Sequence, residues 1–249
     1  MPAEPDSTGG LADAGGWRAV VFDVDGTLVD SERDGHRVAF NAAFEAGGLP
    51  YRWDVPTYGR LLAITGGRRR IAAFLRERGH DDSEAADLAA RLHQDKTSRM
   101  RDFILNGLIG PRPGVTRLLD ELGAAGIPLA VATTGTRDWA EPLVDRLFGL
   151  DRFAVVLTGT EVTALKPDPA VYTEAVRRLD VPPKLALAVE DSANGLRSAT
   201  AAGLPCVVVT NGYTAEQDFT GAAAVYDGFE PCLADRSGPV WSGPRLRAG

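Results

Sequence analysis

Short, continuous apolar runs recur along this chain, and polar residues directly follow most of them. Five runs predict buried strands, at residues 19–22, 128–132, 154–157, 185–189 and 206–209. Continuous rather than alternating apolar runs are typical of parallel strands that helices cover on both faces. Apolar residues at helical spacing fill stretches between the runs, at 116–124, 138–148, 170–179 and 193–202. Strands that alternate with helices predict an α/β fold with a doubly wound parallel sheet.

The interval from about residue 34 to 106 breaks this alternation. Three segments there carry apolar residues at helical spacing: "GHRVAFNAAFEAG", "GRRRIAAFLRERG" and "SEAADLAARLHQDKTSRMRDFI". Ligands of open α/β sheets bind beyond the carboxyl ends of the strands, so a helical insert after the first strand would cover that site. We expect a catalytic core at 17–33 and 108–235, a helical cap at 34–107, a disordered leader at 1–16 and a flexible tail at 236–249.

Charge and composition limit the partners of the chain. Its 249 residues carry a formal net charge of -7 and a pI of about 5.1, whereas binders of nucleic acid or anionic membranes need a basic surface. A small anionic substrate stays open, because a local cationic pocket can exist in an acidic protein. The start has no signal-like pattern, and no apolar run approaches the roughly 18 residues of a membrane span. We expect a cytoplasmic monomer that binds neither nucleic acid nor membranes.

The first apolar run leads into two nearby acids, in "VVFDVDGT". Asp23 and Asp25 would repel each other at a strand end, and a bound dication would remove that repulsion and keep them ionised. Two solvated loop acids are the plainer alternative. An EF-hand is excluded, because it needs Gly at position six and Glu at position twelve, where this chain has Gly26 fourth and Asp34 twelfth. The pair indicates a magnesium site.

Three further strand ends carry polar residues. Thr133 follows the second run, Lys166 lies in the loop after the third, and Glu190 and Asp191 follow the fourth. Taken singly, each has a plainer explanation: a helix cap for the threonine and for the acidic pair, and a solvated side chain for the lysine. Because these strand ends share one edge of a parallel sheet, we expect all four side chains to gather near the acidic pair.

On these residues the chain resembles haloacid dehalogenase superfamily hydrolases that have a helical cap between their first and second motifs. "DVDGT", the threonine after "LAVA", "KPDP" and "EDS" match the four motifs in order, and the match runs from Arg18 to about Asp227. "DSERDGHRVAFN", "YGRLLAITGGRRRI", "HQDKT" and "EDSANGLRSATAAGL" resemble the CbbY group within it. That resemblance implies a phosphatase for the sugar phosphate xylulose-1,5-bisphosphate.

The resemblance also implies a role for each catalytic position. Asp23 would attack phosphorus and form an aspartyl phosphate, and Asp25 would protonate the leaving sugar oxygen and then activate water. Lys166 would pair with the nucleophile and with a phosphoryl oxygen, and Thr133 would donate to another oxygen. Thr134, its neighbour, is a further candidate for phosphate binding.

The implied cofactor is Mg²⁺. Asp23, Asp191 and the backbone carbonyl of Asp25 would hold the ion, with Glu190 bound directly or through water. The ion would clamp the phosphoryl group and neutralise the incoming carboxylate.

The cap should choose the substrate, because a bisphosphate leaves one unreacted phosphate that needs cations. The candidate substrate-binding residues in and beside the cap are Glu32, His36, Arg37, Arg68, Arg70 and Lys96. Glu32 would accept a hydrogen bond from a sugar hydroxyl. The plainer interpretations are that the arginines and the lysine lie on a solvated helix face and that the histidine has only a structural role. In "ATTGT", Gly135 stands where related proteins often have Ser or Thr, which changes a possible substrate contact.

Three rival functions stay open. A β-phosphoglucomutase shares the fold, the acidic pair and magnesium, but gives the phosphoryl group to a sugar instead of water. A broad-range sugar-phosphate phosphatase would use the same residues. A non-catalytic binding module of the same fold is disfavoured, because it has no need of the complete set of Asp23, Asp25, Thr133, Lys166 and Asp191.

Overall fold

The computed structural model describes residues 16–243 and contains a six-stranded parallel sheet with the order β3-β2-β1-β4-β5-β6. The strands are β1 (Ala19–Phe22), β2 (Leu129–Ala132), β3 (Val155–Leu157), β4 (Ala186–Glu190), β5 (Cys206–Val209) and β6 (Ala224–Tyr226). The central strand β1 pairs in parallel with β2 on one side and with β4 on the other. The predicted α/β fold with a doubly wound parallel sheet is confirmed.

Side chains of β1 are buried on both faces of the sheet. Val20 and Phe22 belong to one apolar cluster, and Ala19 and Val21 belong to another. This is why the strand is a continuous apolar run in the sequence, since alternate residues point to opposite faces and both faces are covered.

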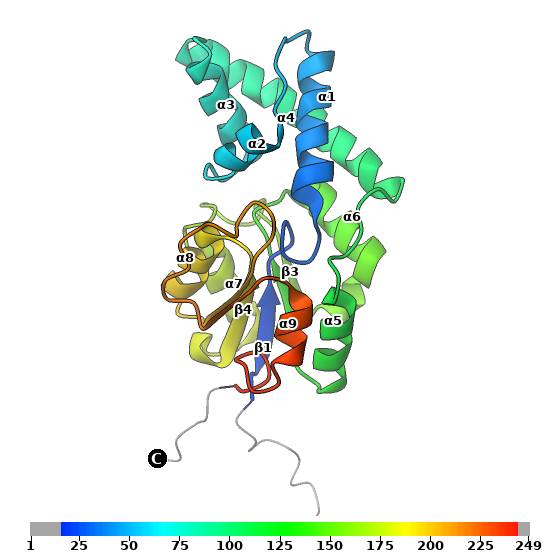
Figure 1. Cartoon of the computed structure of the whole chain (residues 1–249), viewed down its shortest axis with the longest axis vertical. Coiled ribbons are helices and arrows are strands. Elements are labelled where there is room, and N and C mark those ends of the chain that lie inside the picture. Colours follow the sequence, from blue (N-terminus) through cyan, green and yellow to red (C-terminus); the bar gives the residue numbers. More distant parts are fainter. Residues whose placement is uncertain (1–15, 244–249) are drawn as a thin grey trace, which may run out of the picture.

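Helices cover both faces of this sheet (Figure 1). One cluster includes residues of α5 (Val115–Ala124), α6 (Arg137–Phe148) and α9 (Phe229–Ala234). The other includes residues of α7 (Ala170–Leu179) and α8 (Ala193–Ala201). Two short 3₁₀ turns complete this part, at Leu150–Arg152 and Pro183–Leu185.

The helices that follow β1 form a cap beyond the end of the sheet to which the β1 arrow points (Figure 1). The cap consists of a π-helical turn η1 (Glu32–His36), α1 (Arg37–Ala46), α2 (Val55–Leu61), α3 (Gly67–Glu77) and α4 (Asp82–Leu105). These helices enclose their own buried cluster, which is rich in aromatic residues such as Phe44, Trp53 and Phe74. The last part of α4 reaches the core, because Met100 and Ile104 belong to the same apolar cluster as residues of α5, α6 and α9.

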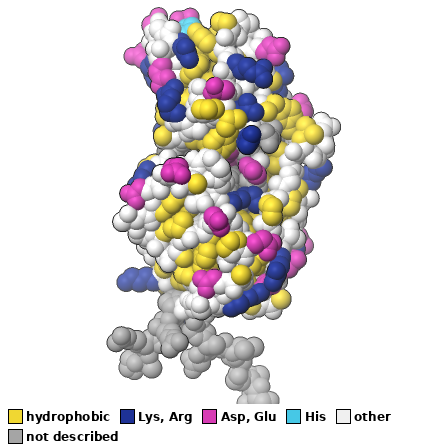
Figure 2. Space-filling model, viewed as in Figure 1, with side chains coloured by type: hydrophobic (Ala, Val, Ile, Leu, Met, Phe, Trp, Pro, Cys, Tyr) yellow, Lys and Arg dark blue, Asp and Glu magenta, His cyan; other side chains and the backbone are white. Residues whose placement is uncertain are grey.

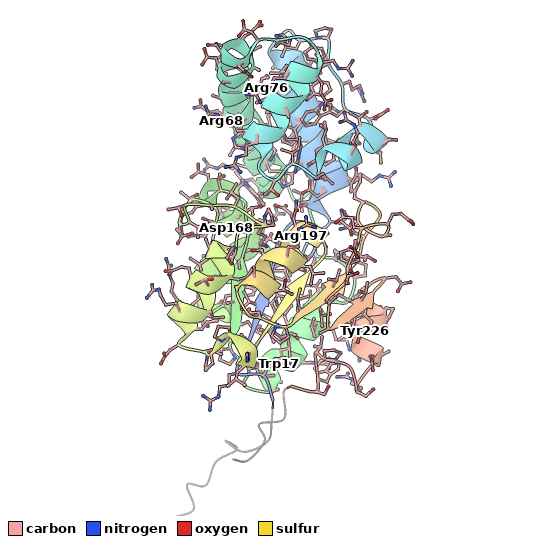
Figure 3. The ribbon with its side chains drawn as sticks, turned by 90° about the vertical axis from the view of Figure 1, so that its left-hand side faces the viewer. Trp17, Arg68, Arg76, Asp168, Arg197 and Tyr226 are labelled. Carbon is pink, nitrogen blue, oxygen red and sulfur yellow. The ribbon has the colours of Figure 1, made fainter. Side chains whose placement is uncertain are left out.

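The end of the described chain includes part of the flexible tail predicted from residue 236. Val240 is buried, and the indole nitrogen of Trp17 donates to the Pro239 carbonyl at 2.6 Å. Trp17 lies at the base of the molecule, near the last described residues (Figure 3). The structure therefore packs part of 236–243 against the core, because one buried valine and one indole can hold even a Gly- and Pro-rich segment. The flexibility of this segment stays a prediction. The predictions for 1–15 and 244–249 lie outside the described residues.

Sequence patterns also missed β6 and α9. None of the three residues of β6 is buried, and Val225 among them is exposed. α9 has six residues with Pro231 among them. Such short elements carry too little periodicity to be recognised. Among residues 16–243, no helix combines the length and the apolar character that a bilayer crossing requires. Acidic and basic side chains are interspersed over the face shown in Figure 2.

Candidate active site

The polar residues predicted at the strand ends meet at one edge of the sheet. Asp23 directly follows β1, Thr133 follows β2, and Asp191 follows β4, whose last residue is Glu190. Lys166 reaches the same place from the loop between β3 and α7. All five side chains are buried. Parallel pairing brings these residues together, because it places the carboxyl ends of neighbouring strands side by side.

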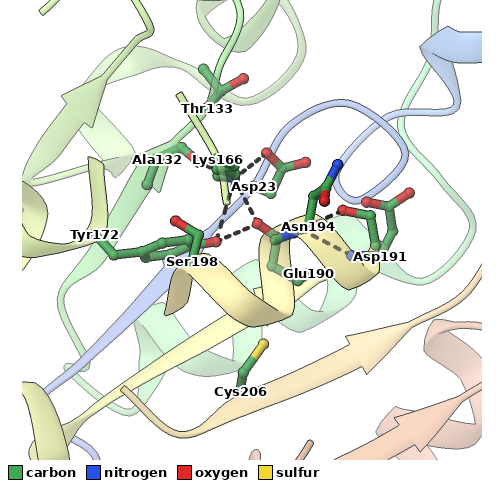
Figure 4. A network of polar contacts seen from close by, with 12 residues as sticks. Asp23, Ala132, Thr133, Lys166, Tyr172, Glu190, Asp191, Asn194, Ser198 and Cys206 are labelled. Atoms are coloured by element: carbon green, nitrogen blue, oxygen red, sulfur yellow. Dashed lines mark hydrogen bonds and ion pairs between the residues drawn. The ribbon is translucent and has the colours of Figure 1, made fainter. Parts of the chain in front are cut away.

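Lys166 is the centre of the network drawn in Figure 4. Its ammonium group donates to Asp23 Oδ1 at 2.6 Å, to Glu190 Oε1 at 2.6 Å and to the Ala132 carbonyl at 2.8 Å. The hydroxyl of Tyr172, from α7, also donates to Glu190 Oε1 at 2.6 Å. Three donations in three directions fix the ammonium next to Asp23.

Burial governs the charge state of this cluster. It raises the pKa of Asp23 to about 8; Lys166 opposes the rise and Glu190 adds to it. It also raises the pKa of Asp191, and the neighbouring Asp23 and Glu190 carboxylates add to the effect. Burial disfavours the charged form of Lys166 too, but Asp23 and Glu190 outweigh it and the lysine pKa is raised. Without a further cation, the acids resist full ionisation.

This cluster fits a divalent metal ion. Asp23, Glu190 and Asp191 each offer a carboxylate oxygen, and these atoms lie within 4.8 Å of one another. Carboxylate oxygens are the hard ligands that Mg²⁺ and Ca²⁺ take. When all three acids are ionised, Lys166 neutralises one of their charges and two negative charges remain. A dication would balance these two charges and so would favour the ionised form of the acids.

The loop after β1 is shaped around Asp191. Gly26 has a φ of 81°, and a Cβ at this position would lie 2.2 Å from Asp191 Oδ2. Asn211, just after β5, donates to the same oxygen at 2.7 Å, and its amide also donates to the Gly26 carbonyl at 3.2 Å. Arg112 donates to that carbonyl and to the Val209 carbonyl. Glycine is therefore needed at position 26 for both backbone conformation and space.

Asp25 faces away from this cluster and toward the cap. Its Oδ1 lies 2.7 Å from His36 Nε2 and also accepts a hydrogen bond from Ser31. The other ring nitrogen of His36 lies 2.7 Å from the ammonium of Lys96, on α4. Burial alone would raise the pKa of Asp25, but His36, Ser31 and Lys96 outweigh it and the pKa is lowered. Burial lowers the pKa of Lys96 to about 8.

The first cap turn brings two of the predicted residues to the site. η1 is a π-helix, in which the Arg37 amide donates to the Glu32 carbonyl; single π turns often occur at functional sites. His36 at its end reaches Asp25, while the Glu32 carboxylate accepts from the hydroxyl of Tyr58. Arg70 donates to the same hydroxyl at 3.0 Å.

Two adjoining cavities lie between the sheet edge and the cap. One, of about 490 Å³, is lined by Asp23, Asp25, Lys166, Glu190 and Asp191 together with residues of α2 and of the loop after β5. The other, of about 250 Å³, is lined by His36, Arg68, Arg70, Lys96 and Trp139. Asp25, Glu32, Arg70 and Thr134 line both, so the two cavities meet at Asp25.

Two predicted contact residues are placed differently from the others. The guanidinium of Arg37 donates to the carbonyls of Arg33 and Trp53, and Arg37 lines neither cavity. Because its guanidinium is bonded to these carbonyls, the structure does not place Arg37 among the residues that line the cavities. Thr133 is buried, and its hydroxyl accepts from the Gly135 amide at 3.0 Å, while its neighbour Thr134 lines both cavities.

Several residues around the site were not predicted. Asn211 had a usable signal, because it is a polar residue just after the fifth apolar run. Tyr58, Tyr172 and Trp139 had none, since aromatic residues at helical spacing normally indicate only a buried face. His93, which lines the smaller cavity, stands in the quoted segment "HQDKT" but was not chosen as a candidate. Their part in the site depends on which helices the fold packs together.

Comparisons with known proteins show which family the chain is similar to. The family model of haloacid dehalogenase-like hydrolases matches residues 17–203. Protein CbbY of Cereibacter sphaeroides is 45% identical over 215 residues, which cover 85% of this chain and 92% of that protein. The crystal structure of CbbY from Rhodobacter sphaeroides in complex with phosphate has a TM-score of 0.81 and 42% identity, and covers 91% of this chain and 99% of that one.

A mutant of the Rhodobacter sphaeroides protein in complex with xylulose-(1,5)bisphosphate is equally similar. Its TM-score is 0.81 and its identity 41%, over 92% of this chain and all of that chain. Since a family model spans most of the described chain and relatives above 40% identity span nearly all of it, the chain belongs to the haloacid dehalogenase-like hydrolases and is similar to the CbbY proteins.

Proposed function

We propose that this hydrolase is a Mg²⁺-dependent phosphatase that removes one phosphate of xylulose-1,5-bisphosphate through a phosphorylated Asp23. The observation that carries the proposal is the pairing of two acids with different surroundings. Asp23 is held by Lys166 beside two further carboxylates, and Asp25 is held by His36 at the cap. A nucleophile and a separate proton donor are what a two-step phosphoryl transfer needs. The complex of the similar CbbY mutant supports the choice of sugar phosphate.

In the first step, an oxygen of Asp23 forms a bond to phosphorus as the bond from phosphorus to the sugar oxygen breaks. Asp25 gives its proton to that sugar oxygen. Because the pKa of Asp25 is lowered here by His36 against the effect of burial, the carboxyl must take up a proton as substrate binds. A phosphate dianion close by raises the pKa of a carboxyl through like charge, and so favours that uptake.

In the second step, Asp25 takes a proton from water and the resulting hydroxide attacks phosphorus. The bond from phosphorus to Asp23 breaks, so inorganic phosphate leaves and the Asp23 carboxylate is restored. The same group serves as acid and then as base, which requires it to lie near phosphorus but outside the line of attack. Asp25 lies two residues from the nucleophile and is turned to His36, which supports this assignment.

Mg²⁺ would be held by Asp23, Asp191 and the backbone carbonyl of Asp25, with Glu190 direct or through water. When bound, it supplies positive charge to the transferring phosphoryl group and to the attacking carboxylate. Lys166 adds a fixed positive charge next to Asp23, and Thr133 and Thr134 offer hydroxyl donors to phosphoryl oxygens. Preorganised charge of this kind supplies most of the acceleration of phosphoryl transfer.

The smaller cavity would take the phosphate that does not react. Arg68 and Lys96 line it, and His36 separates Lys96 from Asp25. Arg70 is less free to move, because its guanidinium already donates to Tyr58 and to the Leu61 carbonyl. Glu32 lies where the two cavities meet and would accept a sugar hydroxyl.

A panel of phosphate esters tests the proposed function. We expect release of phosphate from xylulose-1,5-bisphosphate with a kcat/KM at least about tenfold above that for sugar monophosphates. With a monophosphate, the cationic side chains of the smaller cavity have no anionic partner in the transition state. Equal kcat/KM values across the panel would contradict the bisphosphate preference. Formation of glucose 6-phosphate from β-glucose 1-phosphate, measured in a coupled assay, would favour a mutase instead. The protein is expected to act as a cytoplasmic monomer; sedimentation tests the monomer.

A further inference from the structure

Gly135 is a glycine because a tryptophan occupies the space of its side chain. A Cβ at position 135 would lie 2.2 Å from Cζ2 of Trp139 and 2.8 Å from its Cη2. The backbone does not explain the glycine, since Gly135 is not among the residues with positive φ. The loop that carries Thr133 and Thr134 is therefore matched to a large ring on the first turn of α6.

The same indole touches the cap. Its ring lies edge to face with the His36 imidazole, with centroids 4.9 Å apart and an interplanar angle of 82°. The Lys96 ammonium lies 5.9 Å from the indole and 4.9 Å from the Phe40 ring. Trp139 is buried and lines the smaller cavity with these residues. One core side chain thus contacts two cap residues next to Asp25.

His36 has three neighbours that together define where its ring lies. Asp25 meets one ring nitrogen and Lys96 meets the other, both at 2.7 Å. These two contacts leave the ring free to swing about the line that joins its nitrogens. The indole blocks that motion from the side of the core, because an edge-to-face aromatic contact has a preferred geometry.

We propose that Trp139 is a positioning residue for catalysis, which holds His36 against Asp25 when the cap lies on the core and which requires glycine at position 135. The inference rests on the proposed function, because it assigns Asp25 the proton transfers. Its consequence is specific: for an ester with a single phosphate, which makes no use of the smaller cavity, loss of the indole lowers kcat more than it raises KM.

A purely structural role for Trp139 makes a different prediction. Trp139 belongs to the apolar cluster around β1, so its truncation costs stability in either case. Stability therefore cannot separate the two roles. The balance between kcat and KM does separate them, because packing elsewhere in the core does not change it. The His36 ring signals test the contact between the two side chains.

Histidine ring NMR measures the contact directly. The chain has three histidines; His36 and His93 line the smaller cavity. His80 lines neither cavity, and its ring lies 2.9 Å from the Tyr51 hydroxyl. We expect Trp139→Leu to shift the His36 ring signals through loss of the indole ring current, to leave His80 unchanged, and Trp139→Phe to shift His36 less. Unchanged His36 signals in folded Trp139→Leu would overturn the proposal. These spectra need no substrate, so they judge the contact even if the proposed substrate is wrong.

Kinetics on p-nitrophenyl phosphate and on xylulose-1,5-bisphosphate test the catalytic consequence. We expect Trp139→Leu to lower kcat about 10- to 100-fold on both substrates, as small misplacements of a catalytic group do. The KM for p-nitrophenyl phosphate, which has no second phosphate for the smaller cavity, should change by less than about threefold. Trp139→Phe should recover part of the loss. Trp17→Leu, a buried tryptophan at the base of the molecule, is the matched control and should keep wild-type kcat.

A double-mutant cycle tests the link to Gly135. Gly135→Ala should lower kcat by itself, because its Cβ displaces the indole. In the Trp139→Leu background the same change should have little further effect, because the space is then free. Additive losses would contradict the link, and so would a wild-type kcat in Gly135→Ala. Gly110→Ala, where no atom lies near the added Cβ, is the matched control.

Discussion

Lys166 organises the acidic edge at the scale of single residues. It is shared by Asp23 and Glu190, and Tyr172 bonds the same oxygen of Glu190. Glu190 is therefore held by hydrogen bonds from Lys166 and Tyr172. Asp191 accepts a hydrogen bond from the side-chain amide of Asn211. Two adjacent acids in the sequence thus have different neighbours, and Asp191 is the less constrained candidate metal ligand.

Replacement of Asp23 by Asn tests the covalent route. The amide keeps the shape but is a very poor nucleophile, so phosphate release should fall by at least about 10³-fold. The fold should persist, because the change removes a buried charge that burial already disfavours. Phosphate release and circular dichroism measure the two effects. Wild-type turnover in the folded variant would exclude Asp23 as the nucleophile.

Addition of Mg²⁺ should stabilise the protein. At a concentration of about 100 Kd, binding to the folded state contributes about 2.7 kcal/mol, which raises Tm by roughly 5–10 °C for a chain of this size. Chelation with EDTA should reverse the change. Asp191→Asn should weaken the response, whereas Asp168→Asn, an acid outside the acidic cluster, should keep it. A Tm that does not change on addition of Mg²⁺ would argue against a metal at this site.

At the scale of elements, the first turn of α8 is built around a glycine. Gly195 lies beneath Glu190, and a Cβ there would lie 1.9 Å from the Glu190 carboxyl carbon. The helix therefore approaches the end of β4 more closely than any side chain would allow. The order of strand, acidic pair and helix in the sequence is enough to predict α8, but it does not reveal this contact.

Two helix glycines should respond in opposite directions to alanine. An exposed helix position normally gains up to about 1 kcal/mol from Gly→Ala, and Gly123 in α5 has no atom within reach of an added Cβ. Gly123→Ala should therefore stabilise the protein. Gly195→Ala should destabilise it by about 1–3 kcal/mol through overpacking and lower kcat by displacing Glu190. Chemical denaturation and phosphate release measure both; equal shifts for the two variants would contradict the close approach of α8 to β4.

At the scale of the whole molecule, the cap and the core are separate apolar regions that contact each other at the acidic edge of the sheet. The cap encloses its own aromatic cluster, and contacts such as Asn194 to Thr65 and His36 to Asp25 cross to the core. The two cavities at the sheet edge lie between these regions. The site is therefore complete only when residues of the cap and of the core lie together. This arrangement is consistent with the proposal that the cap selects the substrate.

The described end of the chain closes the base of the molecule. Truncation after Asp235 removes buried Val240 and the acceptor of the Trp17 indole. We expect the free energy of unfolding to fall by about 2–4 kcal/mol, and Tm by roughly 5–15 °C. Activity at low temperature should persist, since the catalytic edge lies at the opposite end of β1. Removal of 244–249 alone is the control for truncation, and an unchanged Tm after the longer truncation would support the flexible-tail prediction instead.

Most of the catalytic edge could be predicted from the sequence by itself. Buried parallel strands are continuous apolar runs, and polar residues at their ends converge whatever the helices do. Asp23, Thr133, Glu190 and Asp191 stand at or directly after strand ends, whereas Asp25 and Lys166 lie in the loops after β1 and β3. The tertiary structure decides which of these six side chains touch.

The cap side was decided by tertiary structure. Arg37 and Arg68 are both arginines near glycines in the sequence, yet Arg37 bonds backbone carbonyls and Arg68 lines a cavity. Tyr58 and Trp139 have the sequence pattern of ordinary core residues, and they border the site only because α2 and α6 pack beside it. A helical pattern specifies which face is buried but not against what, because the partner of that face is chosen by long-range packing.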